Sequence, residues 1–284
     1  MPTPTTLPTT PPTAAPTRRP IIFYSVRDDP ATQAANADLF SVDPVTAVEQ
    51  RLTTETEPDS DPAWSPNGTR IAFDSRRAGG RRDIWVLEAD GLFSRITDSS
   101  PDDALPVWSP DGEMLAWSRG AAGSREIWVG SSRDGSGAHR VTSGHDDIFQ
   151  SWSSAGLIAF QRRDATSEIW VVDPDRSGAV VRITAGQGGG ATPAWSPDGR
   201  RIAFVRLVGG VNRIYIVNAD GVTSLHSLTS AAVCDCEHPA WSRDGTQMPF
   251  VGPKGTVRGI YVVSAAGGTP RRVTTNGLAP FWGS

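Results

Sequence analysis

Two cysteines and a histidine alternate in the short segment CDCEH at residues 234–238. On an extended strand, residues two apart point to the same face, so Cys234, Cys236 and His238 would project together. Thiolate and imidazole groups on one face could hold zinc or another thiophilic metal. However, the cysteine spacing and the missing fourth ligand match structural zinc sites poorly. We therefore favour reduced cysteines without a ligand, then a local disulfide, and only then a metal site.

Acidic residues form a second candidate site. They precede the tryptophan-containing strands of the repeat described below, at Asp59, Asp61, Asp102, Asp103, Asp146, Asp147 and Glu237. If those strands are innermost in a ring, the carboxylates gather at the mouth of its central channel. Like charges held close together raise each other's pKa or attract a cation, so this mouth could bind a divalent cation or a basic partner. The alternative is that these residues cap loop ends with their side chains turned to water.

Catalytic arrangements are not recognisable in the sequence. There is no Gly-x-Ser-x-Gly elbow and no hydrolase-sized segment after the repeats, and no phosphate-binding loop with its lysine. The histidines are scattered at His139, His145, His226 and His238, and we interpret them as surface residues rather than general bases. We therefore predict a protein that is not an enzyme and has no cofactor other than the cation considered above.

The overall composition narrows the partners. The chain has 284 residues, 38% of them apolar, with ten tryptophans and a net charge of -4. No basic stripe points to nucleic acid, no apolar run approaches the roughly 20 residues of a membrane span, and no signal peptide is recognisable. We expect a protein partner, no nucleic acid and no direct membrane insertion.

A unit of 41 to 46 residues repeats from residue 21 onward. Its cleanest copy is PAWSPDGRRIAF at residues 193–204, which predicts a tight turn at Pro197-Asp198-Gly199 followed by a buried strand. The tryptophans of the unit are Trp64, Trp108, Trp152, Trp195, Trp241 and Trp282, at steps of 44, 44, 43, 46 and 41 residues. A fixed period in this range, with about four strands per unit, is typical of propeller blades.

The two ends of the repeat complement each other. The N-terminal copy has strands at 21–25, 38–42 and 50–53 but no tryptophan strand, and the C-terminus supplies one at 280–284. The last strand should complete the first blade, because closing the ring removes free sheet edges. We predict an all-β fold, a monomeric six-bladed β-propeller with four-stranded antiparallel blades over residues 21–284.

Two copies depart from the pattern, and the N-terminus differs from all of them. The fourth blade lacks both prolines around Trp152, and Pro249 replaces an alanine of the sixth, which predicts a local irregularity there. Residues 1–20 are rich in proline and threonine, so we expect a disordered tether.

The motif Pro-Ala-Trp-Ser-Pro-Asp-Gly, followed by Ile-Ala-Phe, Ile-Tyr-Val, Asp-Gly and Arg-Leu-Thr, resembles the repeats of the TolB-like six-bladed β-propellers, which are relatives of the WD-repeat propellers. The similarity covers residues 21–284. It implies a bacterial binding or scaffold module for proteins, in the periplasm or outside the cell. From its composition, we expect the tether at residues 1–20 to join this module to a membrane anchor or another domain. Related propellers also occur as accessory domains of prolyl-oligopeptidase-type serine peptidases and as lyases with a site in the funnel. An enzyme's propeller domain is therefore the alternative function.

Overall fold

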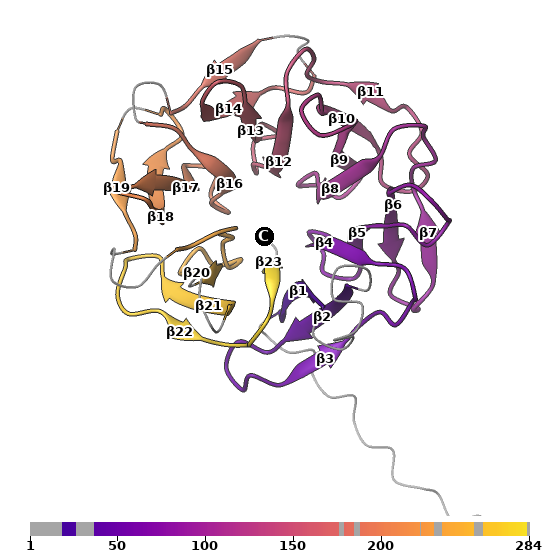
Figure 1. Ribbon diagram of the computed structural model, residues 1–284, viewed down its shortest axis with the longest axis horizontal. Coiled ribbons are helices and arrows are strands. Elements are labelled where there is room, and N and C mark those ends of the chain that lie inside the picture. The colour runs from indigo at the N-terminus through magenta and orange to yellow at the C-terminus, as the bar shows by residue number, and fades with distance from the viewer. Residues whose placement is uncertain are drawn as a thin grey trace, which may run out of the picture.

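Six small antiparallel sheets stand around a central axis (Figure 1). The computed structural model describes residues 19–26, 37–175, 179–184, 188–221, 223–229, 235–252 and 258–282. The arrangement confirms the predicted six-bladed propeller. In the part of the chain that is described, no helix is long and apolar enough to cross a membrane.

The blades follow one another along the chain. In blades 2 to 5 the first strand lies nearest the axis, in blade 1 the C-terminal strand takes that place, and in blade 6 a segment without regular strand pairing does. From the axis outward, blade 1 contains β23 (Leu278–Phe281), β1 (Ile21–Ser25), β2 (Asp38–Val42) and β3 (Glu49–Arg51), and blade 2 contains β4 (Asp59–Trp64), β5 (Ile71–Ser75), β6 (Asp83–Leu87) and β7 (Phe93–Arg95). In the same order, blade 3 contains β8 (Asp103–Trp108), β9 (Met114–Arg119), β10 (Glu126–Ser131) and β11 (His139–Arg140), and blade 4 contains β12 (Asp147–Trp152), β13 (Ile158–Arg163), β14 (Ser167–Val172) and β15 (Val180–Arg182). Blade 5 contains β16 (Ala191–Trp195), β17 (Arg201–Val208), β18 (Val211–Asn218) and β19 (His226–Ser227), and blade 6 contains β20 (Gln247–Gly252), β21 (Gly259–Ser264) and β22 (Arg271–Arg272).

The C-terminal strand closes the ring. β23 pairs antiparallel with β1, with Ile22 opposite Phe281 and Tyr24 opposite Leu278. The indole N–H of Trp282 donates a hydrogen bond to the carbonyl oxygen of Arg19 at 2.8 Å. The last strand of the chain thus completes the blade that the first strands begin, as predicted.

The hydrophobic core lies between successive blades. The second strand of every blade carries a large aromatic residue at the same position, and each is less than 2% exposed: Phe23, Phe73, Trp117, Phe160, Phe204 and Phe250. One core cluster, for example, joins Ile84 of blade 2 to Trp108 and Trp117 of blade 3. Because each blade buries its face against the next, a blade alone would lack a core.

The repeated Trp-Ser-Pro-Asp-Gly motif builds the turn between the first two strands. In blade 5, the Asp198 carboxylate accepts hydrogen bonds from the Ser196 hydroxyl at 2.5 Å and the Arg200 N–H at 3.1 Å. The bond from Ser196 lowers the pKa of Asp198. Gly199 has φ 67°, a left-handed conformation that glycine adopts without strain. The recurring residues of this motif are therefore architectural.

Blade 6 confirms the irregularity predicted at Pro249. Among the described residues, no regular strand pairs with the inner edge of β20. An isolated bridge between Glu237 and Val251, a 3.0 Å bond from the Ala240 N–H to the Pro249 carbonyl and a 2.9 Å bond from the Ser242 N–H to the Gln247 carbonyl join the innermost segment to it. Proline has no N–H with which to return the bond from Ala240, so a regular ladder cannot form there.

Arg19 and Pro20, at the end of the predicted tether, contact the ring. The Arg19 guanidinium donates to the carbonyl oxygens of Ser65 and Pro66 at 3.1 and 2.7 Å. The Trp64 indole donates to the Pro20 carbonyl at 3.1 Å. The remainder of the predicted tether, residues 1–18, lies outside the described residues.

Candidate functional site in the central channel

Each blade places one non-glycine residue of its innermost segment in the left-handed region of backbone space. The φ angles are 50° for Asp61, 60° for Leu105, 52° for Phe149, 47° for Thr192, 50° for His238 and 44° for Ala279. Five of these residues precede a proline, a position that ordinarily favours extended backbone. Such a conformation costs of order 1–3 kcal/mol and persists only where the surrounding structure imposes it.

The left-handed residue belongs to a β-bulge. In blade 2 the register between β4 and β5 shifts between Ser60 and Ala63, and β8, β12, β16 and β23 show the same kind of shift. A bulge bends its strand and re-aims a side chain. Here it brings one side chain per blade to the wall of the central channel.

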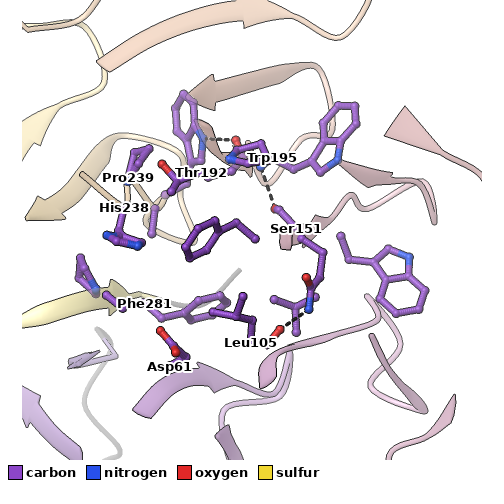
Figure 2. Close-up of a pocket in the computed structure, with 18 of the residues that line it drawn as sticks. Asp61, Leu105, Ser151, Thr192, Trp195, His238, Pro239 and Phe281 are labelled. Atoms are coloured by element: carbon purple, nitrogen blue, oxygen red, sulfur yellow. Dashed lines mark hydrogen bonds between the residues drawn. The ribbon is translucent and has the colours of Figure 1, made fainter. Parts of the chain in front are cut away.

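The channel holds a cavity of about 160 Å³, which all six left-handed residues line. Figure 2 shows labelled side chains from several blades around it. The other lining residues include Pro62, Trp64, Trp108, Gln150, Ser151, Trp152, Trp195, Pro239, Trp241 and Phe281. The wall is therefore mostly apolar and aromatic, with a few polar groups between.

Phe149 reaches across the channel. Its ring lies edge-on to the imidazole of His238, with 5.3 Å between ring centroids and 71° between planes. Phe149 belongs to blade 4 and His238 to blade 6, which are not neighbours. The contact therefore spans the channel and narrows it.

Gln150 accounts for one missing proline of blade 4. It stands where the other five blades have proline, and its amide nitrogen donates to the Leu105 carbonyl of blade 3. Its amide oxygen accepts a bond from the Ser118 hydroxyl at 2.9 Å. The amide thus ties blade 4 to blade 3, which a proline ring could not do.

Asp61 forms a coupled pair with Asp74. Burial raises the pKa of Asp61 well above its usual value, the Asp74 carboxylate raises it further, and Arg82 opposes both. Burial also raises the pKa of Asp74, while Arg82 and the Ser60 hydroxyl lower it. The Arg82 Nη1 and the Ser60 Oγ each lie 3.1 Å from the Asp74 Oδ2. Asp61 therefore holds a proton more readily than an ordinary carboxyl group, and the protonated group can donate a hydrogen bond to Asp74 beside Arg82.

His238 is an uncharged imidazole at neutral pH. Burial, and then the positive charge of Arg258, lower its pKa to about 4. Its Nδ1 is buried and has no hydrogen-bond partner among the described residues. This ring offers the channel an apolar face and one unused polar atom.

Three of the predicted acidic residues are the first residues of inner strands and form repeated ion pairs. These pairs are Asp59 with Arg77, Asp103 with Arg119, and Asp147 with Arg162, each at 2.7 Å. All three carboxylates are fully buried. The guanidinium groups stack on the third-strand aromatics Trp85, Trp128 and Trp170, with 5.4, 4.4 and 4.9 Å between the guanidinium carbon and the ring centroid. In this arrangement the pairs hold each blade together.

The other four acidic residues occupy further positions of the repeat. Asp102 and Asp146 accept backbone N–H bonds from Arg82 and Arg125 of the preceding blade at 3.3 and 3.2 Å, and Glu237 pairs with Arg258. Of the seven, Asp61 lines the cavity. Across the described ranges, no three acidic, histidine or cysteine side chains converge as a metal-ligand set.

The structure corrects the preferred interpretation of the cysteines. Cys236 is buried and disulfide-bonded, so it is neither a reduced thiol nor a free thiolate for a metal. His238 is instead a channel residue. Cys234 lies outside the described residues.

Sequence reasoning named Asp61 and His238 for other roles and missed Leu105, Phe149, Thr192 and Ala279 as channel residues. Their signal is present in the repeat, because the residue three positions before each repeat tryptophan changes from Asp to Leu, Phe, Thr, His and Ala while the tryptophan recurs. A position that varies inside a constant frame can differentiate the blades. The β-bulge that directs it to the axis is a product of sheet pairing and is not visible in the sequence.

Comparison with known proteins agrees with this architecture. The family model described as TolB beta propeller domain (PD40) matches residues 9–178 and 158–281. The chain belongs to the TolB β-propeller family. No curated protein sequence gives a significant match.

Solved structures of TolB propellers are similar to this chain. Putative TolB from Agrobacterium tumefaciens is 22% identical with a TM-score of 0.72, over 92% of this chain and 90% of that one. TolB from Acinetobacter baumannii is 25% identical with a TM-score of 0.76, over 93% of this chain and 66% of that one. A puromycin-hydrolyzing peptidase from Mycobacterium tuberculosis is 18% identical with a TM-score of 0.63, over 86% of this chain and 41% of that one. The family thus shares its propeller with both TolB proteins and peptidases.

Proposed function

We propose that this TolB-family propeller is a non-catalytic binding module and that a segment of a protein partner docks at its central channel. The supporting observation is the channel wall, which is concave, mostly apolar and aromatic, and carries a few placed polar groups, as recognition pockets do. The six left-handed positions differ in residue type within a repeated frame. A ligand without six-fold symmetry needs such differences.

The acidic residues remain part of this proposal as a site for a basic group. Asp61 is the member that a ligand in the channel would meet, because the others face arginines or backbone N–H groups. A cationic side chain beside Asp61 would favour its ionised form. Binding of a basic segment would therefore release a proton from the Asp61–Asp74 pair.

We place this module in the periplasm or outside the cell. The disulfide at Cys236 supports this, because disulfides persist in oxidising compartments. The similarity to TolB proteins supports a bacterial envelope setting.

Site-specific photo-crosslinking tests the channel as the docking site. A photoreactive residue at Leu105, on the channel wall, should yield a discrete cross-linked product with the partner in the native host. The same residue at Val181, which is 59% exposed on outer strand β15, is the matched control. Product at Val181 but not at Leu105 would place the partner elsewhere.

The alternative is the propeller domain of an enzyme. The match to the mycobacterial peptidase, of which the shared region covers 41%, favours it. A hydrolase segment joined to this chain in its gene, together with peptide hydrolysis by the joined protein, would establish this alternative in place of the binding module.

A further inference from the structure

Blades 2, 3 and 4 each contain two carboxylates and two guanidinium groups that neutralise one another. The sets are Asp59, Arg77, Asp83 and Arg95; Asp103, Arg119, Glu126 and Arg140; and Asp147, Arg162, Glu168 and Arg182. The inner pairs are described above, and the outer pairs Arg95–Asp83, Arg140–Glu126 and Arg182–Glu168 are 2.7, 3.3 and 2.5 Å apart. Each set sums to zero charge.

Of these four positions, blade 5 keeps the second-strand arginine, as Arg206, and has other residue types at the remaining three. Arg206 pairs across the sheet with Arg213, whereas Arg119 and Arg162 face Glu126 and Glu168 at the same register. The fourth-strand position opposite the aromatic is Ser227 in blade 5 and arginine in blades 3 and 4.

Glycine replaces the inner carboxylate of blade 5. The Gly190 N–H donates to the Ser167 carbonyl of blade 4 at 2.8 Å, just as the Asp147 N–H donates to the Arg125 carbonyl of blade 3 at 2.9 Å. Gly190 therefore occupies the aspartate position. With two arginines, one glycine and one serine, the set carries a charge of +2 instead of zero.

The two arginines lack the partners that their counterparts have. Arg206 lies over the Tyr215 ring at 5.3 Å, much as Arg162 lies over Trp170. Yet neither Arg206 nor Arg213 forms an ion pair within the described part of the chain, and the Arg213 Nε is buried without a hydrogen-bond partner. Like charges directly opposite on a sheet are unfavourable, and an unsatisfied buried donor costs free energy.

We propose that Arg206 and Arg213 bind a carboxylate, supplied by an aspartate or glutamate side chain of a protein partner. The related blades indicate this chemistry, since Arg119 and Arg162 each hold an aspartate through two bonds of 2.7 and 2.8 Å. That a protein supplies the carboxylate rests on the proposed function. The site itself lies outside the channel cavity and does not rest on it.

The surroundings leave this site to an outside ligand. A Cβ at Gly190 would lie 2.8 Å from the Ile169 side chain, so residue 190 cannot supply a carboxylate without repacking. Arg206 and Arg213 are only half-buried. They belong to the β17–β18 hairpin, whose strands are the longest in the structure and whose Leu207 is 63% exposed. A partner can therefore reach both arginines from solvent.

Titration with an end-blocked, fluorescein-labelled hexaglutamate peptide tests the proposal, with hexaglutamine as the neutral probe. Hexaglutamate should bind the wild-type chain, more weakly as salt rises. Arg206→Gln and Arg213→Glu should each weaken it at least tenfold. Arg213→Glu restores the residue type of blades 3 and 4, so it should fold with an unchanged or higher Tm. Arg243→Glu is the control, because it changes net charge equally at an exposed residue of another blade.

Several outcomes would overturn the assignment. These are no hexaglutamate binding by the wild type, equal affinity in the Arg213→Glu and Arg243→Glu variants, or equal binding of hexaglutamine. Displacement of the peptide by equimolar inorganic phosphate would point to a general anion site instead. Phe149→Arg alters the channel alone and should leave hexaglutamate binding intact, so failure of this site and failure of channel docking are distinguishable.

Discussion

Asp61 and His238 are the titratable side chains on the wall of the channel, and burial shifts their pKa values in opposite directions. The carboxyl group has a raised pKa, and the imidazole has a pKa of about 4. In both cases desolvation favours the uncharged form. The free channel therefore carries little charge of its own, and each residue should make unfolding depend on pH.

Asp61→Asn should raise the Tm at neutral pH. Because the folded-state pKa of Asp61 is raised, its contribution to stability is complete below the unfolded value and is lost as pH rises through the folded value. Asparagine cannot ionise and can still donate to Asp74. Thermal unfolding from pH 3 to pH 8 should show the two proteins alike at the acid end and separating as pH rises. A constant difference at every pH would contradict the raised pKa.

His238→Gln should improve the tolerance to acid. The pKa of His238 is lowered, so its contribution is complete above the ordinary value of 6.5 and is lost as pH falls towards about 4. That loss amounts to at most about 3 kcal/mol. Denaturant unfolding at pH 7 and pH 4 measures it, with His139→Gln at an exposed strand residue as the control. Equal acid sensitivity of wild type and His238→Gln would show that the imidazole is not desolvated.

The elements themselves were largely predictable. Trp64, Trp108 and their equivalents recur at nearly constant steps, and that spacing predicts the number of blades. The turn around Asp198 follows from local side-chain chemistry. The bulge at Asp61 and the arginine partners of Asp59 and Asp103 arise from pairing between strands, so the sequence predicted the acidic residues but not which of them would face the channel.

The segment before β1 contributes to the ring through Arg19. Deletion of residues 1–20 should lower stability by at least about 2 kcal/mol relative to deletion of residues 1–18, because four hydrogen bonds are lost. Arg19 donates two of them, and the Trp64 and Trp282 indoles donate the other two to the carbonyls of Pro20 and Arg19. Differential scanning calorimetry of the two truncated proteins measures the difference. Identical Tm values would mean that Arg19 and Pro20 add nothing to the ring.

At the scale of the whole molecule, the propeller depends on the pairing of its two ends. Deleting residues 278–284 removes β23 and exposes the edge of β1, which should cause aggregation or a large loss of stability. Size-exclusion chromatography and thermal unfolding would detect this. A soluble, monomeric truncated protein with the wild-type Tm would contradict closure by the last strand.

The central claim is that the ring presents its channel to a protein partner. Calorimetric titration of the partner found by cross-linking, against wild type, Phe149→Arg and the outer-surface control Val181→Arg, tests it most directly. We predict at least a tenfold loss of affinity for Phe149→Arg, because Phe149 spans the channel against His238, and no change for Val181→Arg. Unchanged affinity in a folded Phe149→Arg variant would contradict docking at the channel.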